Sequence, residues 1–209
     1  MATVLIVDDH PALRLVMRSQ LSQLLGMEHI LEADNGQCAI EAVRRHKPDL
    51  VILDLDIPRI GGLDVATRVR DIHPAARILV VTALDPAVFV PRAWQAGAQG
   101  FVSKTQDIRE ILRAVESVMA GYTVFPALAR RNAFGPALCG DDESLRRLSD
   151  KELVVLKMLA RGMSYKDIGR ELFISNKTVS SYKARIMAKL RVGSLVELVD
   201  FARRCRLVQ

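Results

Sequence analysis

The first part of the chain, to about residue 120, alternates between short apolar runs and longer stretches in which apolar residues recur with helical spacing. Five of the runs have the continuous apolar character of buried parallel strands; they cover residues 3–7, 29–33, 50–53, 78–81 and 100–102. Helical spacing follows each run, over residues 11–25, 37–46, 63–71, 88–96 and 108–119. This (βα)5 order predicts an α/β fold with a doubly wound parallel sheet, right-handed crossovers and helices on both faces.

The alternating pattern breaks after Gly121. Turn-forming Gly and Pro residues and the acidic triplet 141–143 show no sustained period, so residues 126–146 are predicted to form a linker. The linker separates a first domain, residues 1–125, from a second domain, residues 147–209.

The second domain contains four helical segments with no strand-like run between them. Two of the segments begin with a hydroxyl residue followed three positions later by Glu: Ser149 with Glu152, and Ser194 with Glu197. This spacing is typical of a capping box, in which the two side chains satisfy free amide groups at a helix start. We therefore expect a small all-α, four-helix domain.

Charge is divided unevenly between the domains. Residues 149–209 carry 13 Lys and Arg against 6 Asp and Glu, a net charge of +7, whereas residues 1–125 carry 13 against 15, a net charge of −2. Basic surface acts where it clusters, so only the second domain is expected to meet a polyanion such as nucleic acid. A basic face that is merely solvated is the alternative.

Cysteine usage and hydropathy exclude several other classes of protein. Cys38, Cys139 and Cys205 lie far apart without CxxC spacing, so neither a disulfide framework nor a zinc site is indicated. No apolar run approaches the roughly 20 residues that span a bilayer, and the apolar start is too short and uncharged for a signal peptide. A cytoplasmic protein without a membrane partner is expected.

Polar residues cluster where the predicted strands end. Asp8 and Asp9 follow the first strand, Asp54 the third and Thr82 the fourth, and Lys104 comes shortly after the fifth. The carboxyl ends of parallel strands share one edge of the sheet, where ligands bind. Converging carboxylates repel each other unless a cation neutralises them, and Mg²⁺ suits this donor set. An Asp after a strand is often only a turn former or a helix cap, but the joint pattern favours a metal-assisted phosphoryl site with Asp54 as nucleophile.

Four stretches of the first domain resemble the receiver domain of two-component response regulators, which has a flavodoxin-like fold. They are Val7-Asp8-Asp9-His10-Pro11, Asp54-Leu-Asp56-Ile-Pro58 with Gly62, Val81-Thr82-Ala83, and Gly97-Ala-Gln-Gly-Phe101-Val-Ser-Lys104. The resemblance implies that the phosphoacceptor is Asp54 and that Lys104 binds the phosphoryl group.

The resemblance also assigns the remaining residues of that site. It implies that Mg²⁺ is held by Asp8, Asp9 and the backbone carbonyl of Asp56, and that Thr82 and Phe101 form the switch pair. The expected phosphodonor is a sensor histidine kinase or a hybrid phosphorelay protein. Catalysis is then limited to self-phosphorylation from a phosphodonor and autodephosphorylation at the phosphoacceptor.

Two positions depart from the usual receiver pattern. Thr105 follows the lysine where many receivers have proline, and Asp56 stands where methionine is common. The second change adds a carboxylate near the metal and is expected to alter the dephosphorylation rate.

The third helical segment of the second domain has the character of a recognition helix. Val179, Ile186 and Leu190 fall on one face, and small polar and cationic residues occupy the other. Such a helix can lie in a major groove, although an ordinary solvated helix has the same pattern.

Longer strings in this domain resemble the LuxR-type helix-turn-helix of the NarL/FixJ response regulators. They are Leu148-Ser-Asp-Lys-Glu152, Ala160-Arg-Gly-Met-Ser-Tyr-Lys-Asp-Ile168, Leu172-Phe-Ile-Ser175, Lys177-Thr-Val179 and Lys189-Leu190. The resemblance implies base-edge contacts from Ser180, Ser181 and Ala184. It implies phosphate contacts from Lys177, Thr178, Tyr182, Lys183 and Arg185, and Lys189 belongs to the same outer face.

The fuller string from residue 173 to residue 183, together with Gly121-Tyr-Thr-Val-Phe-Pro126, resembles the BvgA/EvgA branch of that family. The branch implies a hybrid phosphorelay sensor as partner and control of virulence or surface-adhesion genes. The family implies a phosphorylation-controlled homodimer on double-stranded promoter DNA, with RNA polymerase as a candidate further partner.

Two other functions fit part of the sequence. The apolar strand with Asp54 and Asp56 also resembles the nucleophile motif of haloacid-dehalogenase phosphatases, but the acidic pair Asp8-Asp9 precedes it instead of following late in the chain. The other alternative is a regulator that binds DNA without phosphorylation and uses the first domain as a dimerisation scaffold.

Overall fold

The computed structural model describes residues 2–24, 27–126, 144–145, 147–172, 174–205 and 207–208. The chain forms two compact units, Met1–Phe134 and Gly135–Gln209. Most of the predicted linker, residues 127–143 and 146, lies outside the described residues, so its bounds and those of the two domains remain a prediction.

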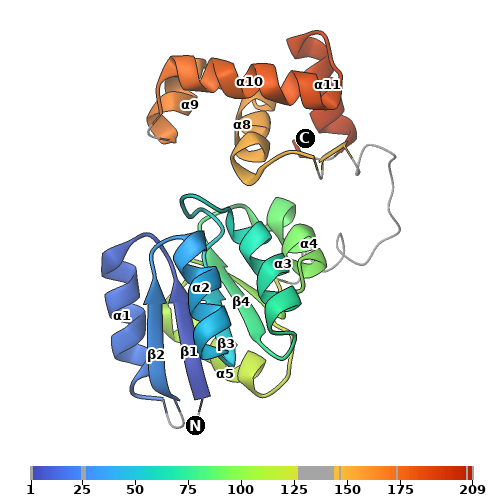
Figure 1. Cartoon of the computed structure of the whole chain (residues 1–209). Coiled ribbons are helices and arrows are strands. Elements are labelled where there is room, and N and C mark those ends of the chain that lie inside the picture. Colours follow the sequence, from blue (N-terminus) through green and yellow to red (C-terminus); the bar gives the residue numbers. More distant parts are fainter. Residues whose placement is uncertain are drawn as a thin grey trace. The chain divides into compact units, whose positions relative to one another are not determined.

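A parallel sheet of five strands is the centre of the first unit (Figure 1). The strands run in the order β2-β1-β3-β4-β5. Their bounds are β1 Ala2–Val7, β2 Met27–Ala33, β3 Leu50–Leu53, β4 Arg77–Thr82 and β5 Gly100–Ser103. All four neighbouring pairs are parallel, as the continuously apolar runs predicted.

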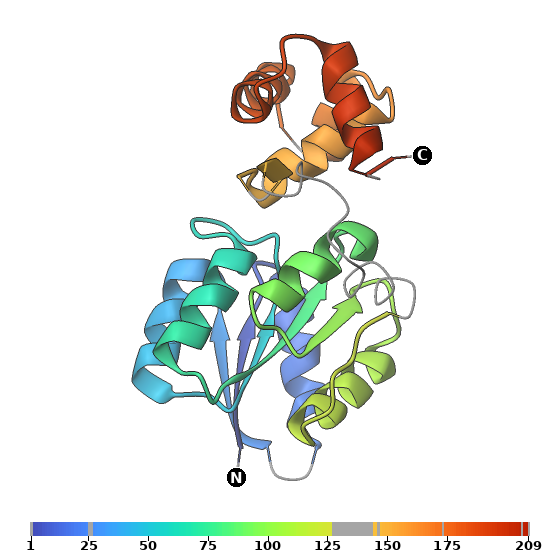
Figure 2. The ribbon, with the colours of Figure 1, turned by 90° about the vertical axis from the view of Figure 1, so that its right-hand side faces the viewer.

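Helices cover both faces of this sheet, which confirms the doubly wound fold (Figure 2). They are α1 Pro11–Leu21, α2 Gly36–His46, α3 Gly62–Ile72, α4 Pro86–Gln95 and α5 Ile108–Met119. One apolar core joins alternate residues of the strands, among them Ile6, Ile52 and Val81, to buried residues of α1 and α5 such as Met17 and Val115. This core fixes the sheet as the rigid base from which the strand ends project.

In the first unit, two helix boundaries differ from the predicted ones by more than one residue, for local reasons. The first helix ends at Leu21, with Ser22 as its C-cap, and not at residue 25, which lies outside the described residues. The fourth begins at Pro86, two residues before the predicted start. Asp85 caps it by accepting a hydrogen bond from the amide of Ala87, and proline suits the first helical turn because its missing N–H leaves no donor unsatisfied there.

The segment after α5 returns along the free edge of β5. The amide of Phe101 donates to the carbonyl of Val124 at 2.7 Å, and the amide of Val124 donates to the carbonyl of Gln99 at 2.9 Å. Phe125 then packs edge-on against Trp94 of α4, with ring centroids 5.2 Å apart. An edge strand with unpaired amides is thereby covered, and residues 124–125 belong structurally to the first unit.

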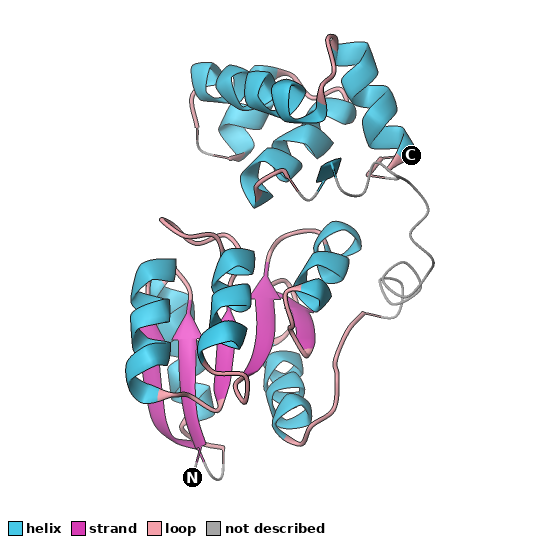
Figure 3. Cartoon of the chain, turned by 45° about the vertical axis from the view of Figure 1, so that its right-hand side comes forward, coloured by secondary structure: helices cyan, strands magenta, loops and turns pink. Residues whose placement is uncertain are grey.

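Helices joined by short loops make up the described part of the second unit, which contains no strand there (Figure 3). Its helices are α8 Asp150–Ala160, α9 Tyr165–Glu171, α10 Asn176–Leu190 and α11 Leu195–Arg204. Fully buried side chains from each helix form a small core: Val155 and Leu156, Ile168, Val179 and Ile186, and Leu198. The expected four-helix domain is confirmed.

Serine residues cap all four of these helices, but the two predicted capping boxes differ. At α8 the box is complete, since Ser149 and Glu152 each bond the other's backbone amide. At α11, Ser194 accepts from the amide of Glu197 at 3.2 Å, while the Glu197 carboxylate bonds the amide of Gly193 at 2.9 Å. The second box is therefore displaced by one residue.

Gly62, at the start of α3, has no room for a side chain. A Cβ there would press on the backbone carbonyl of Asp54 and come within 2.5 Å of Cα of Leu55. We expect Gly62→Ala to lower the free energy of unfolding of the first unit by about 1–3 kcal/mol, the usual cost of overpacking. Urea unfolding of the full chain checks this.

The control is Gly193→Ala, whose added Cβ would meet nothing nearer than the Glu197 carboxylate oxygens at 3.9 Å. It should change stability by no more than about 0.5 kcal/mol. Equal effects of the two substitutions would contradict the packing argument.

Candidate functional site

The carboxyl edge of the sheet brings the predicted site residues of the first unit together. Asp8 follows β1, Asp54 follows the neighbouring β3, and Thr82 ends the next strand, β4. Their side chains are buried: the exposed fractions are 3%, 2% and 0%. Hydrogen bonds from the amide of Asp54 to the carbonyl of Val7, and from the amide of Lys104 to the carbonyl of Thr82, extend the strand pairing to this edge.

Lys104 neutralises two of the buried carboxylates at once. Its Nζ lies 2.7 Å from Oδ2 of Asp54 and 2.7 Å from Oδ2 of Asp8. Burial opposes the charge of Lys104, but these carboxylates together raise its pKa above the usual value. Burial is also the largest influence on Asp54 and raises its pKa; Lys104 lowers it in part, and the charge of Asp8 raises it further. The site therefore holds more negative charge than one ammonium group offsets.

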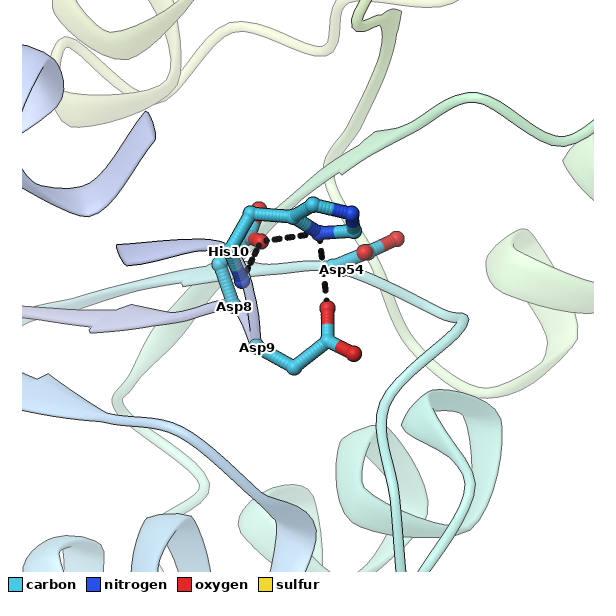
Figure 4. Close-up of side chains that lie close together, drawn as sticks. All are labelled: Asp8, Asp9, His10 and Asp54. Carbon is cyan, nitrogen blue, oxygen red and sulfur yellow. Dashed lines mark hydrogen bonds and ion pairs between the residues drawn. The ribbon is translucent and has the colours of Figure 1, made fainter. Parts of the chain in front are cut away.

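The remaining negative charge lies where a divalent cation could bind. Asp8, Asp9, His10 and Asp54 each offer one ligand atom, and these four atoms all lie within 4.8 Å of one another (Figure 4). The three carboxylates, of which that of Asp9 is exposed, form a donor set that fits Mg²⁺, which prefers oxygen ligands and keeps several waters. The acidic cluster is thus consistent with the expected cofactor.

Two residues of this site were missed in the sequence. His10 was assigned no role, yet its Nδ1 lies 2.7 Å from Oδ1 of Asp9 and 3.2 Å from Oδ1 of Asp8. Arg14 donates a hydrogen bond of 2.7 Å to the backbone carbonyl of Asp8 and pairs with Glu32. For His10, the available signal in the sequence was its position directly after the acidic pair. For Arg14, the contact with Asp8 arises only when α1 is folded.

The expected switch residues share one face of the sheet. Phe101 pairs in register with Val80, and Thr82 lies two residues further along the same strand, so the side chains of Thr82 and Phe101 point to the same side. The ring of Phe101 is 1% exposed and lies inside the fold.

The two departures from the usual receiver pattern leave the site intact. The side chain of Asp56 is exposed, while its amide donates to Oδ1 of Asp54 at 3.2 Å. Thr105 takes part in a local turn, in which its hydroxyl lies 2.8 Å from that of Ser103. Hydroxyl bonding therefore orders the residues on either side of Lys104 without proline.

In the second unit, α10 presents the predicted polar face. Val179, Ile186 and Leu190 are buried. The base-edge set of Ser180, Ser181 and Ala184 is exposed, as are Lys177 and Arg185, whereas Thr178, Tyr182 and Lys183 are half-buried. The helix thus has one apolar face in the core and an outer face with small central residues.

Aromatic rings support two cations of this face. Cζ of Arg185 lies 4.6 Å from the ring centroid of Tyr182, and Nζ of Lys183 lies 5.8 Å from that of Tyr165. Such contacts hold a cation in place while leaving its outer side free. Tyr165, on α9, is a residue of this surface that the sequence analysis did not single out.

Lys189 is held differently from the other cations. Its Nζ lies 2.6 Å from Oε2 of Glu152, which is buried in α8. Lys189 is exposed, as expected for the outer face, but its ammonium group is paired with this carboxylate of α8.

The fold and site of the first unit define a class of protein: a five-stranded doubly wound domain whose carboxyl edge holds a buried Asp, an acidic pair and a lysine is a receiver. Comparison with known families agrees. Residues 4–116 match the response regulator receiver domain, and residues 146–202 match the bacterial regulatory proteins of the luxR family. The chain belongs to the two-component response regulators that carry a LuxR-type DNA-binding domain, which leaves the phosphatase alternative without support.

Relatives align over nearly the whole chain. The virulence factors transcription regulator BvgA of Bordetella pertussis is 44% identical over 202 residues, 96% of each chain. The fimbriae Z protein of Salmonella typhimurium is 37% identical over 202 residues, 97% of this chain and 96% of its own. The expected likeness to BvgA is confirmed.

A solved structure shows the same fold over both units. RcsB from Salmonella enterica serovar Typhimurium, bound to promoter rprA with the phosphomimetic BeF3⁻, has a TM-score of 0.58 and 24% identity. The alignment covers 97% of this chain and 99% of that one. None of the described helices is both long and apolar enough to cross a membrane.

The charge excess at the receiver site predicts the effect of Asp54→Asn without metal. Removing a carboxylate whose charge is disfavoured should raise the free energy of unfolding at pH 7 by about 1 kcal/mol. The pKa of the Asp54 carboxyl group is raised in the folded state. The contribution of this group to the free energy of unfolding is therefore fully present below the unfolded-state pKa, and it is lost as the pH rises through the folded-state pKa.

The difference in free energy of unfolding between the Asn variant and the wild type should therefore become smaller as the pH is lowered. Urea unfolding in the presence of a chelator, measured across the acidic range, checks this. A difference between variant and wild type that does not depend on pH would contradict the assignment of the excess charge to Asp54.

Proposed function

We propose that this response regulator accepts a phosphoryl group on Asp54 and that phosphorylation controls dimerisation and DNA binding. The observation that carries the proposal is the position of Asp54. Its carboxylate is buried at the sheet edge, one oxygen is bound to Lys104, and the acidic pair Asp8-Asp9 lies within ligand distance. An Asp with only a structural role would not require both a lysine and an acidic pair beside it.

The chain's own groups suit an in-line transfer of a phosphoryl group. A carboxylate oxygen of Asp54 attacks phosphorus; the new P–O bond forms as the bond to the imidazole of a histidine kinase, or to acetate of acetyl phosphate, breaks. Lys104 holds one phosphoryl oxygen, and the hydroxyl of Thr82 donates to another. Asp8, Asp9 and the backbone carbonyl of Asp56 would hold Mg²⁺. When bound, this ion neutralises charge on the transferring group.

The phosphorylated site would act on the rest of the domain through Thr82 and Phe101. Thr82 is drawn toward the new phosphoryl oxygens, and the ring of Phe101, on the same face, follows. Since this ring is already buried, the movement is a shift within the core and not a transfer from solvent. The surface around α4 and α5 changes with it and controls formation of a homodimer.

The dimer would bind promoter DNA through α10. Ser180, Ser181 and Ala184 face the base edges, and cations around them contact phosphates: Lys177, Lys183 and Arg185, with Thr178 and Tyr182 beside them. The net charge of +7 on residues 149–209 favours this polyanion. The promoter-bound structure of RcsB, whose fold this chain shares, supports the same mode of binding.

The partners are those that a receiver domain and a DNA-binding domain call for, and the relatives' names support the class of target genes. A sensor histidine kinase or hybrid phosphorelay protein supplies the phosphoryl group, and RNA polymerase is the partner at the promoter. Names such as virulence factors regulator and fimbriae Z protein support control of virulence or surface-adhesion genes.

The first experiment tests the phosphoacceptor directly. Full-length protein incubated with Mg²⁺ and labelled acetyl phosphate is expected to take up a single labile phosphoryl group and to shift toward a dimer in sedimentation. Asp54→Asn should abolish both effects, because the amide cannot accept the group.

A matched control is Asp56→Asn, two residues away with an exposed side chain, which should still take up label. Promoter binding by Asp54→Asn at wild-type affinity, with no change on phosphorylation of the wild type, would favour the alternative in which the receiver is only a scaffold.

A further inference from the structure

The contact between Lys189 and Glu152 joins helix α10 to helix α8 in the DNA-binding unit. We propose that Lys189 is a positioning residue, which fixes the recognition helix α10 through Glu152 and does not bind a DNA phosphate. The inference rests on the proposed DNA contacts of α10, because it concerns how they are held in place.

A single carboxylate oxygen receives two donors at this point. Oε2 of Glu152 accepts a bond of 2.6 Å from Nζ of Lys189 and one of 2.8 Å from the amide of Ser149. The amide of Glu152 in turn donates to the Ser149 hydroxyl at 3.3 Å. The capping box that starts α8 is therefore the anchor of Lys189.

The charges make this anchor strong. Glu152 is 3% exposed. Burial alone would raise its pKa, but the bonds from Lys189 and Ser149 outweigh burial and hold the pKa of Glu152 below its usual value. The carboxylate is thus charged at neutral pH, and the ammonium group of Lys189 is its partner within the unit.

The position of the pair in α10 gives it a geometric effect. Lys189 lies between Ile186 and Leu190, which pack in the core, and one turn beyond Arg185. Apolar contacts alone allow neighbouring helices to slide, whereas an ion pair with a buried, doubly bonded carboxylate fixes one orientation. That orientation determines which way Lys177, Ser180 and Ala184 point.

A move of the Lys189 ammonium group away from Glu152 and onto a phosphate would be unfavourable. It would leave Glu152 with a buried charge and one donor fewer. Lys177 and Lys189 are both exposed along their side chains, but only the ammonium group of Lys189 has a buried carboxylate as partner in the described structure. The two lysines of the same helix therefore serve as a matched pair for a test.

The test is the salt dependence of promoter binding by the full-length, phosphorylated chain. Each lost phosphate contact lowers the magnitude of the slope of log affinity against log salt by about 1. Lys177→Met should show this decrease. Lys189→Met should weaken binding at least tenfold and leave the slope unchanged.

The substitution Glu152→Gln distinguishes a positioning role of Lys189 from a phosphate contact, because it leaves the lysine itself in place. Gln keeps an acceptor for Ser149 but loses the charge that holds Lys189. Positioning predicts weaker binding for this variant and no further loss when Lys189→Met is added, because both changes break one contact. Binding equal to or tighter than wild type would overturn the proposal, since a freed Lys189 would then be available to DNA.

Circular dichroism at the assay temperature shows whether each variant is folded. If Lys177→Met leaves the slope unchanged, the proposed phosphate contacts fail. If it lowers the slope and Lys189→Met lowers it equally, only the positioning role fails.

Discussion

The bridge that Lys104 makes between Asp8 and Asp54 is the interaction on which the receiver depends. Both carboxylates are almost fully buried, and burying a charge is unfavourable unless an opposite charge accompanies it. The lysine reaches both because β1 and β3 are neighbours and the loop after β5 returns to the same edge. The reactive carboxylate is therefore held by the topology of the sheet as much as by any single bond.

The charge excess left by this bridge connects stability with function. One ammonium group faces two buried carboxylates and the more exposed Asp9, and the pKa of Asp54 is raised chiefly by burial and further by the charge of Asp8. A divalent cation relieves the charge excess. A site with excess negative charge is suited to bind a divalent cation, and Gly62 packs closely against the backbone of Asp54.

The second unit also contains a buried carboxylate, that of Glu152, but its pKa is shifted in the opposite direction. Glu152 is buried like Asp54, and each accepts from a lysine and a backbone amide. The charge of a second buried carboxylate, Asp8, acts on Asp54, whereas the bonds to Glu152 outweigh burial and lower its pKa. The comparison shows why burial of a carboxylate alone does not mark a reactive site. What matters is whether the surrounding groups match its charge.

The strands and helices could be predicted closely, because each bears its own period of apolar residues. The errors fell where local bonding decides: Asp85 and Pro86 begin α4 early, and the Glu197 carboxylate bonds Gly193 instead of Ser194. His10 and Arg14 were missed for another reason. Their contacts join separate elements or depend on how a side chain turns, and neither is encoded by spacing along the chain.

The sequence by itself determined the order of strands and helices, the division of charge between the two parts, and the set of residues at the strand ends, because these depend on composition and periodicity alone. Only the tertiary structure decided how those residues are paired. It gave Lys104 two carboxylates, placed Phe101 inside the fold, and joined Lys189 to Glu152, 37 positions away in the sequence. Such pairings are set by packing between distant elements, which no local pattern contains.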